Sequence, residues 1–422
     1  MKHKEKSVLI IGAGIAGLTA AKLAKAAGLN IVVIEASDGV GGRVRTDYKE
    51  GFLLDRGFQV LLTAYPEAKK LLNYDALDLK SFKPGACILE KQAIFKIGDP
   101  FREPSLLLNT LLAPVGTLRD KFKLLKLKLS LAFTSLETVF ERPETTTLAY
   151  LRNHGFSERC IETFFRPFYA GIFLEKELAT SSRMFEFTFK MFGEGAAAIP
   201  AGGMGMISSQ LASGLGTDEL ILNEEVINIS GTTVTTKSGK CYSATAVIIA
   251  TDAPHIPLAK LENKIDKSKG ALTLYFGADK KTQISHRITL NAIKNQLVNN
   301  IAFLDHISPL YAPPDKSLIS VSVSTSESFE TLKLETMVRQ ELLQWYPESI
   351  AWKLLAIYDI PYALPRNETV NYSVDKHQAQ LTENCFICGD HLLNGSINAA
   401  MKSAQIAVSA MLDSALFNPE KP

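Results

Sequence analysis

The sequence lacks the features that mark disulfide-linked secreted proteins and membrane-spanning proteins. Its 422 residues include only five cysteines, an odd and scattered number that does not fit a secreted disulfide framework and favours a reducing compartment. No run of about 18 consecutive apolar residues is present, so we expect no transmembrane helix. The apolar run at 8–11 is too short for the core of a signal peptide. We therefore expect a cytoplasmic protein, with peripheral contact to a membrane left open.

A strong charge bias and metal-binding motifs are also missing. Lysine and arginine number 46 against 44 aspartates and glutamates, which excludes the global positive charge of a nucleic-acid-binding protein. The seven histidines show no metal-ligand spacing. Cys385 and Cys388 form a CxxC, but they fall on an expected buried strand, where residues three apart point to opposite faces. We predict no nucleic-acid partner, no metal and no redox pair.

The chain alternates strand-like and helix-like patterns. Residues 7–11, 16–27 and 31–34 read as strand, helix and strand around a glycine-rich turn. Residues 104–192 are predominantly helical and are punctuated by prolines. Three strand-like runs between 224 and 251 predict a meander that returns to the first sheet, and residues 331–346 predict an amphipathic helix.

A GxGxxG motif stands in the first turn. Gly12 permits the tight turn, Gly14 allows a pyrophosphate to approach the helix N-terminus, and Gly17 lets the helix pack on the strands. Glu35 ends the second strand, where it would accept hydrogen bonds from ribose hydroxyls. The alternative is a glycine-rich turn without a ligand, but a strand, a turn, a helix and an acidic residue in register favour a dinucleotide site.

The segment "GVGGRVRT" at 39–46 narrows the choice of dinucleotide. Gly41 and Gly42 let the backbone lie against a flat or phosphorylated ligand, and Arg43 and Arg45 offer guanidinium groups for the pyrophosphate and the edge of a ring. A surface turn with two solvated arginines is the alternative. A site for NAD alone has no need of this second segment.

These residues carry a family resemblance. The segment "IIGAGIAGLTAAKLAKAAGLNIVVIEASDGVGGRVRT" closely resembles the N-terminus of the flavin amine oxidase superfamily, which includes monoamine oxidases, protoporphyrinogen oxidases and phytoene desaturases. "FLLDRGFQVL", "IPAGGMGMISSQLA", "LNEEVINI", "VIIATDAP" and "CGDHLLNGSINAAMKSAQIA" resemble later motifs of that superfamily, in the same order. The resemblance implies that the cofactor is FAD.

The same resemblance implies which residues contact FAD. Asp390 would face the pyrophosphate and ribityl chain, Val226 would meet the adenine through its backbone, and a helix from about Ile397 would point its positive end at the flavin. The full predicted set is Gly12, Gly14, Ile15, Ala16, Gly17, Glu35, Ala36, Gly41, Gly42, Arg43, Arg45, Gly57, Phe58, Gln59, Val226, Thr251, Gly389, Asp390, Ser396 and Ile397.

The expected fold class is α/β. It comprises a Rossmann-like FAD-binding domain built from the discontinuous segments 1–80, 200–260 and 380–422. An α+β substrate-binding domain with a helical part, made of 81–199 and 261–379, is inserted between them.

The chain departs from the amine-oxidising members of the superfamily. Those enzymes carry a lysine over flavin N5, but the matching run here is "KGALTLYFGAD", with Lys269 just before it. Ser396 stands where they have an aromatic residue, and "GSINAA" resembles carotenoid desaturases instead. No catalytic residue is assigned. His391 is either a proton donor near the flavin or a residue that caps a loop.

An aromatic segment at 164–195 is expected on the substrate side. Its rings either line a long apolar cavity, with Arg166 and Arg183 at a polar end, or pack against one another as helical core. The aromatic residues in question are Phe165, Phe168, Tyr169, Phe173, Phe185, Phe189 and Phe192.

The segment 118–133 predicts a basic amphipathic helix, with Leu118, Phe122, Leu125 and Leu129 on one stripe. Such a helix lies in a membrane interface or presents the solvated face of a packed helix. The membrane interpretation suits a small lipophilic substrate that arrives from the bilayer.

The expected activity is transfer of a hydride from a C–H bond of an apolar, polyene-like or porphyrinogen-like substrate to flavin N5. The alternatives are a flavin amine oxidase that releases H2O2 and a redox-neutral FAD-dependent isomerase. Substrate identity, electron acceptor and oligomeric state stay open at this point.

Overall fold

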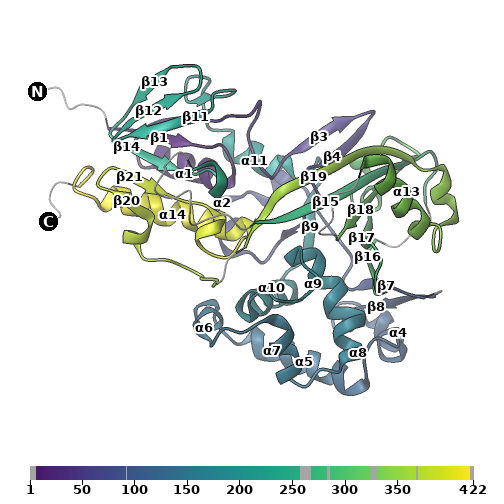
Figure 1. Cartoon of the computed structure of the whole chain (residues 1–422). Coiled ribbons are helices and arrows are strands. Elements are labelled where there is room, and N and C mark those ends of the chain that lie inside the picture. The colour runs from purple at the N-terminus through teal and green to yellow at the C-terminus, as the bar shows by residue number, and fades with distance from the viewer. Residues whose placement is uncertain are drawn as a thin grey trace, which may run out of the picture.

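The computed structural model describes residues 6–91, 93–256, 268–282, 286–324, 330–366 and 369–418. Two large sheets and a group of helices dominate these residues (Figure 1). The six-stranded sheet takes its strands from residues 7–34, 220–249 and 380–387, and the seven-stranded sheet from 86–97 and 268–365. The domain boundaries stay a prediction, and the one at 260 lies outside the described residues. The predicted α/β fold class is confirmed.

The first sheet has six strands that come from distant parts of the chain. Five of them run parallel, and β20 pairs antiparallel at one edge. Along β1, Val8 and Ile10 belong to the core shared with the helices, whereas Leu9 and Ile11 belong to a cluster on the opposite face. The strand order is β10 (Leu220–Ile221), β2 (Asn30–Ile34), β1 (Ser7–Ile11), β14 (Ala246–Ile249), β21 (Cys385–Ile387) and β20 (Gln380–Thr382).

Helices cover one face of this sheet and a small sheet covers the other. Helix α1 (Ile15–Ala26) packs on α14 (Ile397–Asp413) and on α11 (Gly205–Ala212). The opposite cluster includes Val234 of the three-stranded sheet β11 (Val226–Ser230), β12 (Thr233–Thr236) and β13 (Cys241–Ser243). The expected meander is therefore only partly right, because these three strands form their own sheet and only β14 joins the first one.

The second large sheet has seven strands and carries one helix on its outer side. Helix α13 (Thr331–Leu342) buries Leu334, Val338 and Leu342 in the same core as Phe276 and ends four residues before the predicted end. The strand order is β19 (Lys353–Pro365), β15 (Ser268–Ala278), β18 (Ser317–Val323), β17 (Val298–Phe303), β16 (Ile288–Asn291), β7 (Ala86–Glu90) and β8 (Ala93–Ile97).

The predicted helical segment is present and lies at the lower end of the view (Figure 1). Between α8 and α9, Ile161–Phe165 forms a π-helical turn. Pro167 follows this turn and has no N–H to donate to it. The helices are α4 (Leu107–Leu112), α5 (Leu118–Ala132), α6 (Leu136–Glu141), α7 (Thr147–Asn153), α8 (Glu158–Cys160), α9 (Arg166–Phe173) and α10 (Ser182–Glu194).

Short elements connect these parts. The remaining strands and α-helices are β3 (Thr46–Lys49), β4 (Phe52–Asp55), β5 (Leu61–Leu62), β6 (Leu79–Ser81), β9 (Ala197–Pro200), α2 (Pro66–Leu71), α3 (Tyr74–Leu77) and α12 (Leu304–Ile307).

Among the described residues, no helix combines the length and the apolarity that a membrane crossing needs.

A buried carboxyl group joins three of these segments. Asp55, at the end of β4, accepts hydrogen bonds from Thr46 Oγ1 (2.5 Å), Tyr311 Oη (2.7 Å) and the backbone N–H of Met204 (2.8 Å). The residue is 2% exposed, and burial raises its pKa to about 6 despite these donors.

The pKa of Asp55 predicts a pH dependence of stability. An unfolded aspartate has a pKa of about 3.9, so the native state binds this proton more tightly than the unfolded state does. The contribution is therefore complete below pH 4 and is lost as pH rises through 6, a decline of roughly 2–3 kcal/mol in the free energy of unfolding. The variant Asp55→Asn should lack this decline in urea denaturation between about pH 4 and pH 7.

The control for this experiment is Asp279→Asn, whose side chain is 89% exposed. This control should keep the wild-type pH dependence. Parallel stability curves for wild type and Asp55→Asn would contradict the assignment.

Candidate active site

One large cavity runs through the middle of the protein, with a volume of about 1450 Å³. A pocket for a single small molecule typically measures about 300–1,000 Å³, so this space is large enough for a cofactor together with a second ligand. Its lining begins at the glycine turn after β1 and continues to the aromatic residues of α9 and α10.

The cofactor end of the cavity lies at the carboxyl edge of the six-stranded sheet. Ile11 is in register with Ile34 of β2 and with Ile249 of β14, and Ile249 is in register with Ile387 of β21. The residues that follow these strands therefore meet at one edge, which is where open parallel sheets bind their ligands.

The glycine turn after β1 has the geometry of an anion site. Gly12 has a φ of +99°, and a Cβ on Gly17 would lie 1.9 Å from the carbonyl oxygen of Gly12, so both positions require glycine. A Cβ on Gly14, in contrast, would meet nothing within 4 Å. Helix α1 begins after Gly14 with no side-chain cap and no acidic residue in its first turn, which leaves its N–H groups for a phosphate.

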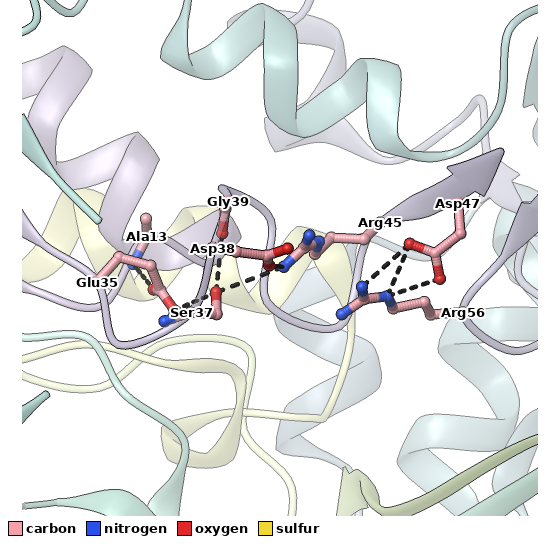
Figure 2. A network of polar contacts seen from close by, with 8 residues as sticks. All are labelled: Ala13, Glu35, Ser37, Asp38, Gly39, Arg45, Asp47 and Arg56. Atoms are coloured by element: carbon pink, nitrogen blue, oxygen red, sulfur yellow. Dashed lines mark hydrogen bonds and ion pairs between the residues drawn. The ribbon is translucent and has the colours of Figure 1, made fainter. Parts of the chain in front are cut away.

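Glu35 is tied to the glycine turn. Its Oε2 accepts a hydrogen bond from the backbone N–H of Ala13 (2.6 Å), and its Oε1 accepts from the N–H and the hydroxyl of Ser37 (2.9 and 2.7 Å), as Figure 2 shows. A carboxylate has about four acceptor positions and three are used here, so one remains for a ribose hydroxyl. The contact with ribose remains a prediction.

The second glycine loop lies directly on the first. The N–H of Gly41 donates to the carbonyl of Ala13 (2.7 Å), and a Cβ on Gly42 would approach Gly14 Cα to 3.4 Å. Gly41 and Gly42 have φ values of +113° and +56°, in the region that favours glycine. These two glycines therefore serve the packing of one loop on the other, and both also line the cavity.

The two arginines of this segment have different environments. Arg43 lines the cavity and forms a two-pronged ion pair with Asp390, with Nη2 to Oδ1 at 2.6 Å and Nη1 to Oδ2 at 3.0 Å. Arg45 does not line the cavity. It crosses under Gly39 and pairs with Asp38 (2.8 Å), beside Ser37 (Figure 2). In place of the expected contact with the ligand, Arg45 contacts Asp38 and Ser37 within its own loop.

The Arg43–Asp390 pair joins two segments that are 347 residues apart in the sequence, at the cavity wall. Burial alone would raise the pKa of Asp390, but the attraction of Arg43 outweighs it and lowers that pKa. The pKa of Arg43 is raised in turn by Asp390 against the effect of burial. Arg43 also lies over the ring of Tyr362 (5.4 Å) and donates to the carbonyl of Ala363 (2.9 Å).

The structure brings most of the predicted FAD contacts together. Eighteen of the twenty residues line the cavity, and the exceptions are Gly17 and Arg45. Among the cavity-lining residues, Thr251 has a buried hydroxyl with no hydrogen-bond partner, which fits a polar ligand at this place. Val226, Gly57, Phe58 and Gln59 also line the cavity, so the residues present fit a dinucleotide.

Some rings of the aromatic segment line the cavity and others are packed in the helical core, so each of the two alternatives holds for part of the segment. Phe168, Tyr169, Phe189 and Phe192 line the far arm of the cavity, with Phe164 in addition. Phe165, Phe173 and Phe185 are fully buried core instead.

The expected polar end at Arg166 and Arg183 is not found among the lining residues. Arg166 pairs with Glu162 (2.9 Å), and Arg183 donates to the carbonyl of Arg142 (2.8 Å).

An asparagine pair that sequence reasoning missed lies beside this arm. A β-bulge between Val298 and Asn300 places Asn299 and Asn300 so that both amide nitrogens approach Gly171, where a Cβ would meet them at 2.9 and 2.8 Å. Both residues are buried, and Asn300 lines the cavity. The signal was two adjacent polar residues inside the apolar run "LVNNIAF".

Lys269, His391 and the two cysteines of the CxxC are all at least partly buried. Lys269 donates to Thr180 Oγ1 (2.7 Å), and Ala271 rather than Lys269 lines the cavity. Burial lowers the pKa of His391, whose ring packs against Gly389 with neither nitrogen hydrogen-bonded. Cys385 and Cys388 are buried free thiols with pKa values raised by burial to about 11 and about 12. No metal-binding cluster occurs in the described part of the chain.

A sequence model of the flavin containing amine oxidoreductases matches residues 15–412. The chain belongs to this family. A flavin amine oxidoreductase binds FAD and is an FAD-dependent oxidoreductase, as the resemblance of the motifs implied.

Individual curated relatives match only part of the chain. Protoporphyrinogen oxidase 2 of Arabidopsis thaliana is 28% identical over 166 residues, which is 39% of this chain and 32% of that protein. The chain thus matches about a third of the length of this curated relative.

Two solved structures share the fold over nearly the whole chain. A provisionally assigned protoporphyrinogen oxidase from Exiguobacterium sp. 255-15 is 20% identical, with a TM-score of 0.73 and coverage of 97% of this chain and 99% of that one. Cyclohexylamine oxidase from Brevibacterium oxydans is 16% identical, with a TM-score of 0.68 and coverage of 99% and 100%.

The glycine geometry predicts separable effects on folding and on FAD binding. The variant Gly14→Ala should fold normally, because its Cβ meets only open space, but should weaken FAD binding at least about tenfold by filling the space over the helix N-terminus. The variant Gly17→Ala should be unstable even without FAD, because its Cβ meets the Gly12 carbonyl. Flavin absorbance after gel filtration and thermal unfolding of the apoprotein measure the two effects.

Gly214→Ala is the matched control, since its Cβ also meets nothing within 4 Å and Gly214 does not line the cavity. Undiminished FAD retention by Gly14→Ala would refute the placement of the pyrophosphate.

Proposed function

We propose that this flavin amine oxidoreductase oxidises an apolar substrate by removing a hydride from one of its C–H bonds. The observation that carries the proposal is the far arm of the cavity, which is walled by aromatic and aliphatic side chains. FAD, when bound, supplies the hydride acceptor at N5 of its ring. A polyene-like or porphyrinogen-like molecule fits such a wall better than a small charged one.

The side chains along the cavity support orientation and exclusion of water. Phe58, Ile360 and Ala271 line one zone of the cavity, where Ile360 is in register with Ala271 and lies next to Gly57. These groups hold no exchangeable side-chain proton, so their contribution is to position the reacting carbon and to keep the zone dry. Positioning by packing suits hydride transfer, which needs no general base.

The asparagine pair supports a substrate with a polar group at one end. Asn300 is the amide on the wall of the arm, and Tyr169 of α9, whose hydroxyl is buried, also lines the cavity. Polar groups that are few and fixed orient a ligand within an apolar pocket. We therefore expect a largely apolar substrate with a hydrogen-bonding terminus.

Oxidation of amines with release of H2O2 is the second candidate, and the cyclohexylamine oxidase fold is the observation that favours it. Against it stands Lys269, whose ammonium group is engaged with Thr180. A redox-neutral isomerisation is the third candidate. It differs from both in that the flavin returns no electrons to an external acceptor.

Anaerobic mixing tests these candidates together. The FAD-loaded protein is mixed with porphyrinogens, with polyenes and with a panel of amines, and flavin absorbance is followed. Bleaching by a porphyrinogen or polyene but by no amine is expected. Bleaching by amines alone would replace the proposal with amine oxidation, and turnover without bleaching would indicate isomerisation.

The aromatic arm predicts a steric effect on this reaction. Phe168 packs beside Phe164 (ring centroids 5.8 Å apart) and Phe192 (5.1 Å), so the variant Phe168→Trp should narrow the arm. It should lower kcat/KM for a bulky substrate about tenfold, the equivalent of about 1.4 kcal/mol, and leave FAD content unchanged. Stopped-flow flavin reduction measures the effect.

The control for this variant is Leu332→Trp on α13, where the side chain is 76% exposed. An unchanged rate in Phe168→Trp would show that the substrate does not enter this arm.

A further inference from the structure

Large apolar side chains are concentrated on one exposed surface of the protein. Of the sixteen exposed large hydrophobic residues in the described part of the chain, nine fall between residues 101 and 133. We call this segment the entry surface. Its most exposed side chains are Phe101 (71%), Leu108 (67%), Leu112 (81%), Phe122 (72%) and Phe133 (89%).

The entry surface is one continuous patch. Lys128 of α5 lies over the ring of Phe101 (5.3 Å), and Lys121 donates to the carbonyls of Leu111 (2.6 Å) and Ala113 (3.0 Å), so α4, α5 and the preceding loop are held together. A shallow apolar groove on α5 continues the patch toward Phe133. Both helices lie at the end of the molecule away from α1 and α14 (Figure 1).

The charge of this surface is positive. Residues 101–133 contain six basic and two acidic side chains. Both acidic ones are engaged within the protein, because Glu103 pairs with Arg287, and Asp120 accepts from Thr117 and Ser157. Arg119 and Lys126 are exposed beside the apolar residues. Arg102 and Lys128 pair with Asp99, which precedes the segment, so six basic side chains stand against three acidic ones. Exposed apolar side chains with an excess of cations fit an interface of acyl chains and anionic headgroups.

The cavity reaches the exterior within the entry surface. Phe101, Leu107, Leu111 and Phe122 are exposed and also line the cavity that contains the aromatic arm. An apolar ligand that leaves a bilayer at this place would enter the cavity that contains the arm, past Arg102 and Lys121, which also line it.

We propose that the entry surface docks on anionic phospholipid bilayers and admits the substrate from the lipid phase. A second copy of this chain fits less well, because a twofold contact would bring the positively charged entry surface of one copy against the same surface of the other. Docking itself needs no substrate. The route of substrate entry rests on the proposed function. Vesicle binding tests the docking and flavin bleaching tests the proposed function, so a negative result in one assay leaves the other proposal standing.

Vesicle sedimentation of the FAD-loaded protein tests the docking. Wild type should sediment with vesicles of phosphatidylcholine and phosphatidylglycerol and much less with phosphatidylcholine alone. The triple variant Leu108→Ser, Leu112→Ser, Phe133→Ser removes exposed residues that do not line the cavity, and it should bind at least about tenfold more weakly. A second variant, Arg119→Glu with Lys126→Glu, should lose the preference for anionic lipid.

The matched control is Leu332→Ser with Ile350→Ser, whose side chains are 76% and 75% exposed on the second sheet domain. It should bind as wild type does. Circular dichroism and flavin absorbance of each variant verify folding. Absence of wild-type binding to either vesicle would overturn the proposal, as would equal binding by the triple variant. A dimer in sedimentation velocity that the triple variant abolishes would assign the surface to a second copy instead.

Discussion

The parallel pairing of β1 with β14, and of β14 with β21, is the constraint on which the site depends. These strands lie far apart in sequence, yet their registers end level, at Ile11, Ile249 and Ile387. Gly12, Thr251 and Gly389 consequently face the same cavity. Because every parallel connection needs a long crossover, the intervening sequence is free to build a second sheet and a helical region beside the same edge.

The cavity combines two kinds of wall for two kinds of ligand. At the sheet edge the wall is backbone, glycine and a few fixed charges such as Arg43 and Asp390, which suit a phosphorylated cofactor. In the aromatic arm the wall is made of rings from α9 and α10, with Asn300 as a polar exception. Both walls belong to one cavity.

The sequence predicts well what short-range chemistry determines. The glycine turn and the second glycine loop follow from local motifs, because Gly12, Gly41 and Gly42 have positive φ and Gly17 packs against the Gly12 carbonyl. Most of the other predicted positions that line the cavity follow from the family resemblance and not from short-range chemistry. What depends on tertiary packing is not predictable from local sequence. Arg43 and Arg45 look equivalent in the sequence, but only Arg43 pairs with Asp390. Phe165 and Phe168 also look alike, yet Phe165 is buried in the core and Phe168 lines the cavity. The bulge that aligns Asn299 with Asn300 depends on pairing with β18.

The Arg43–Asp390 pair has a consequence for the order of events during synthesis. Its partners are 347 residues apart, and β21 lies next to β14 inside the first sheet. A growing chain therefore cannot complete this sheet until residues near 390 have left the ribosome. Non-local pairing of this kind folds slowly and leaves apolar strands uncovered in the meantime. Capture of the cofactor must therefore follow translation of residues up to about 390.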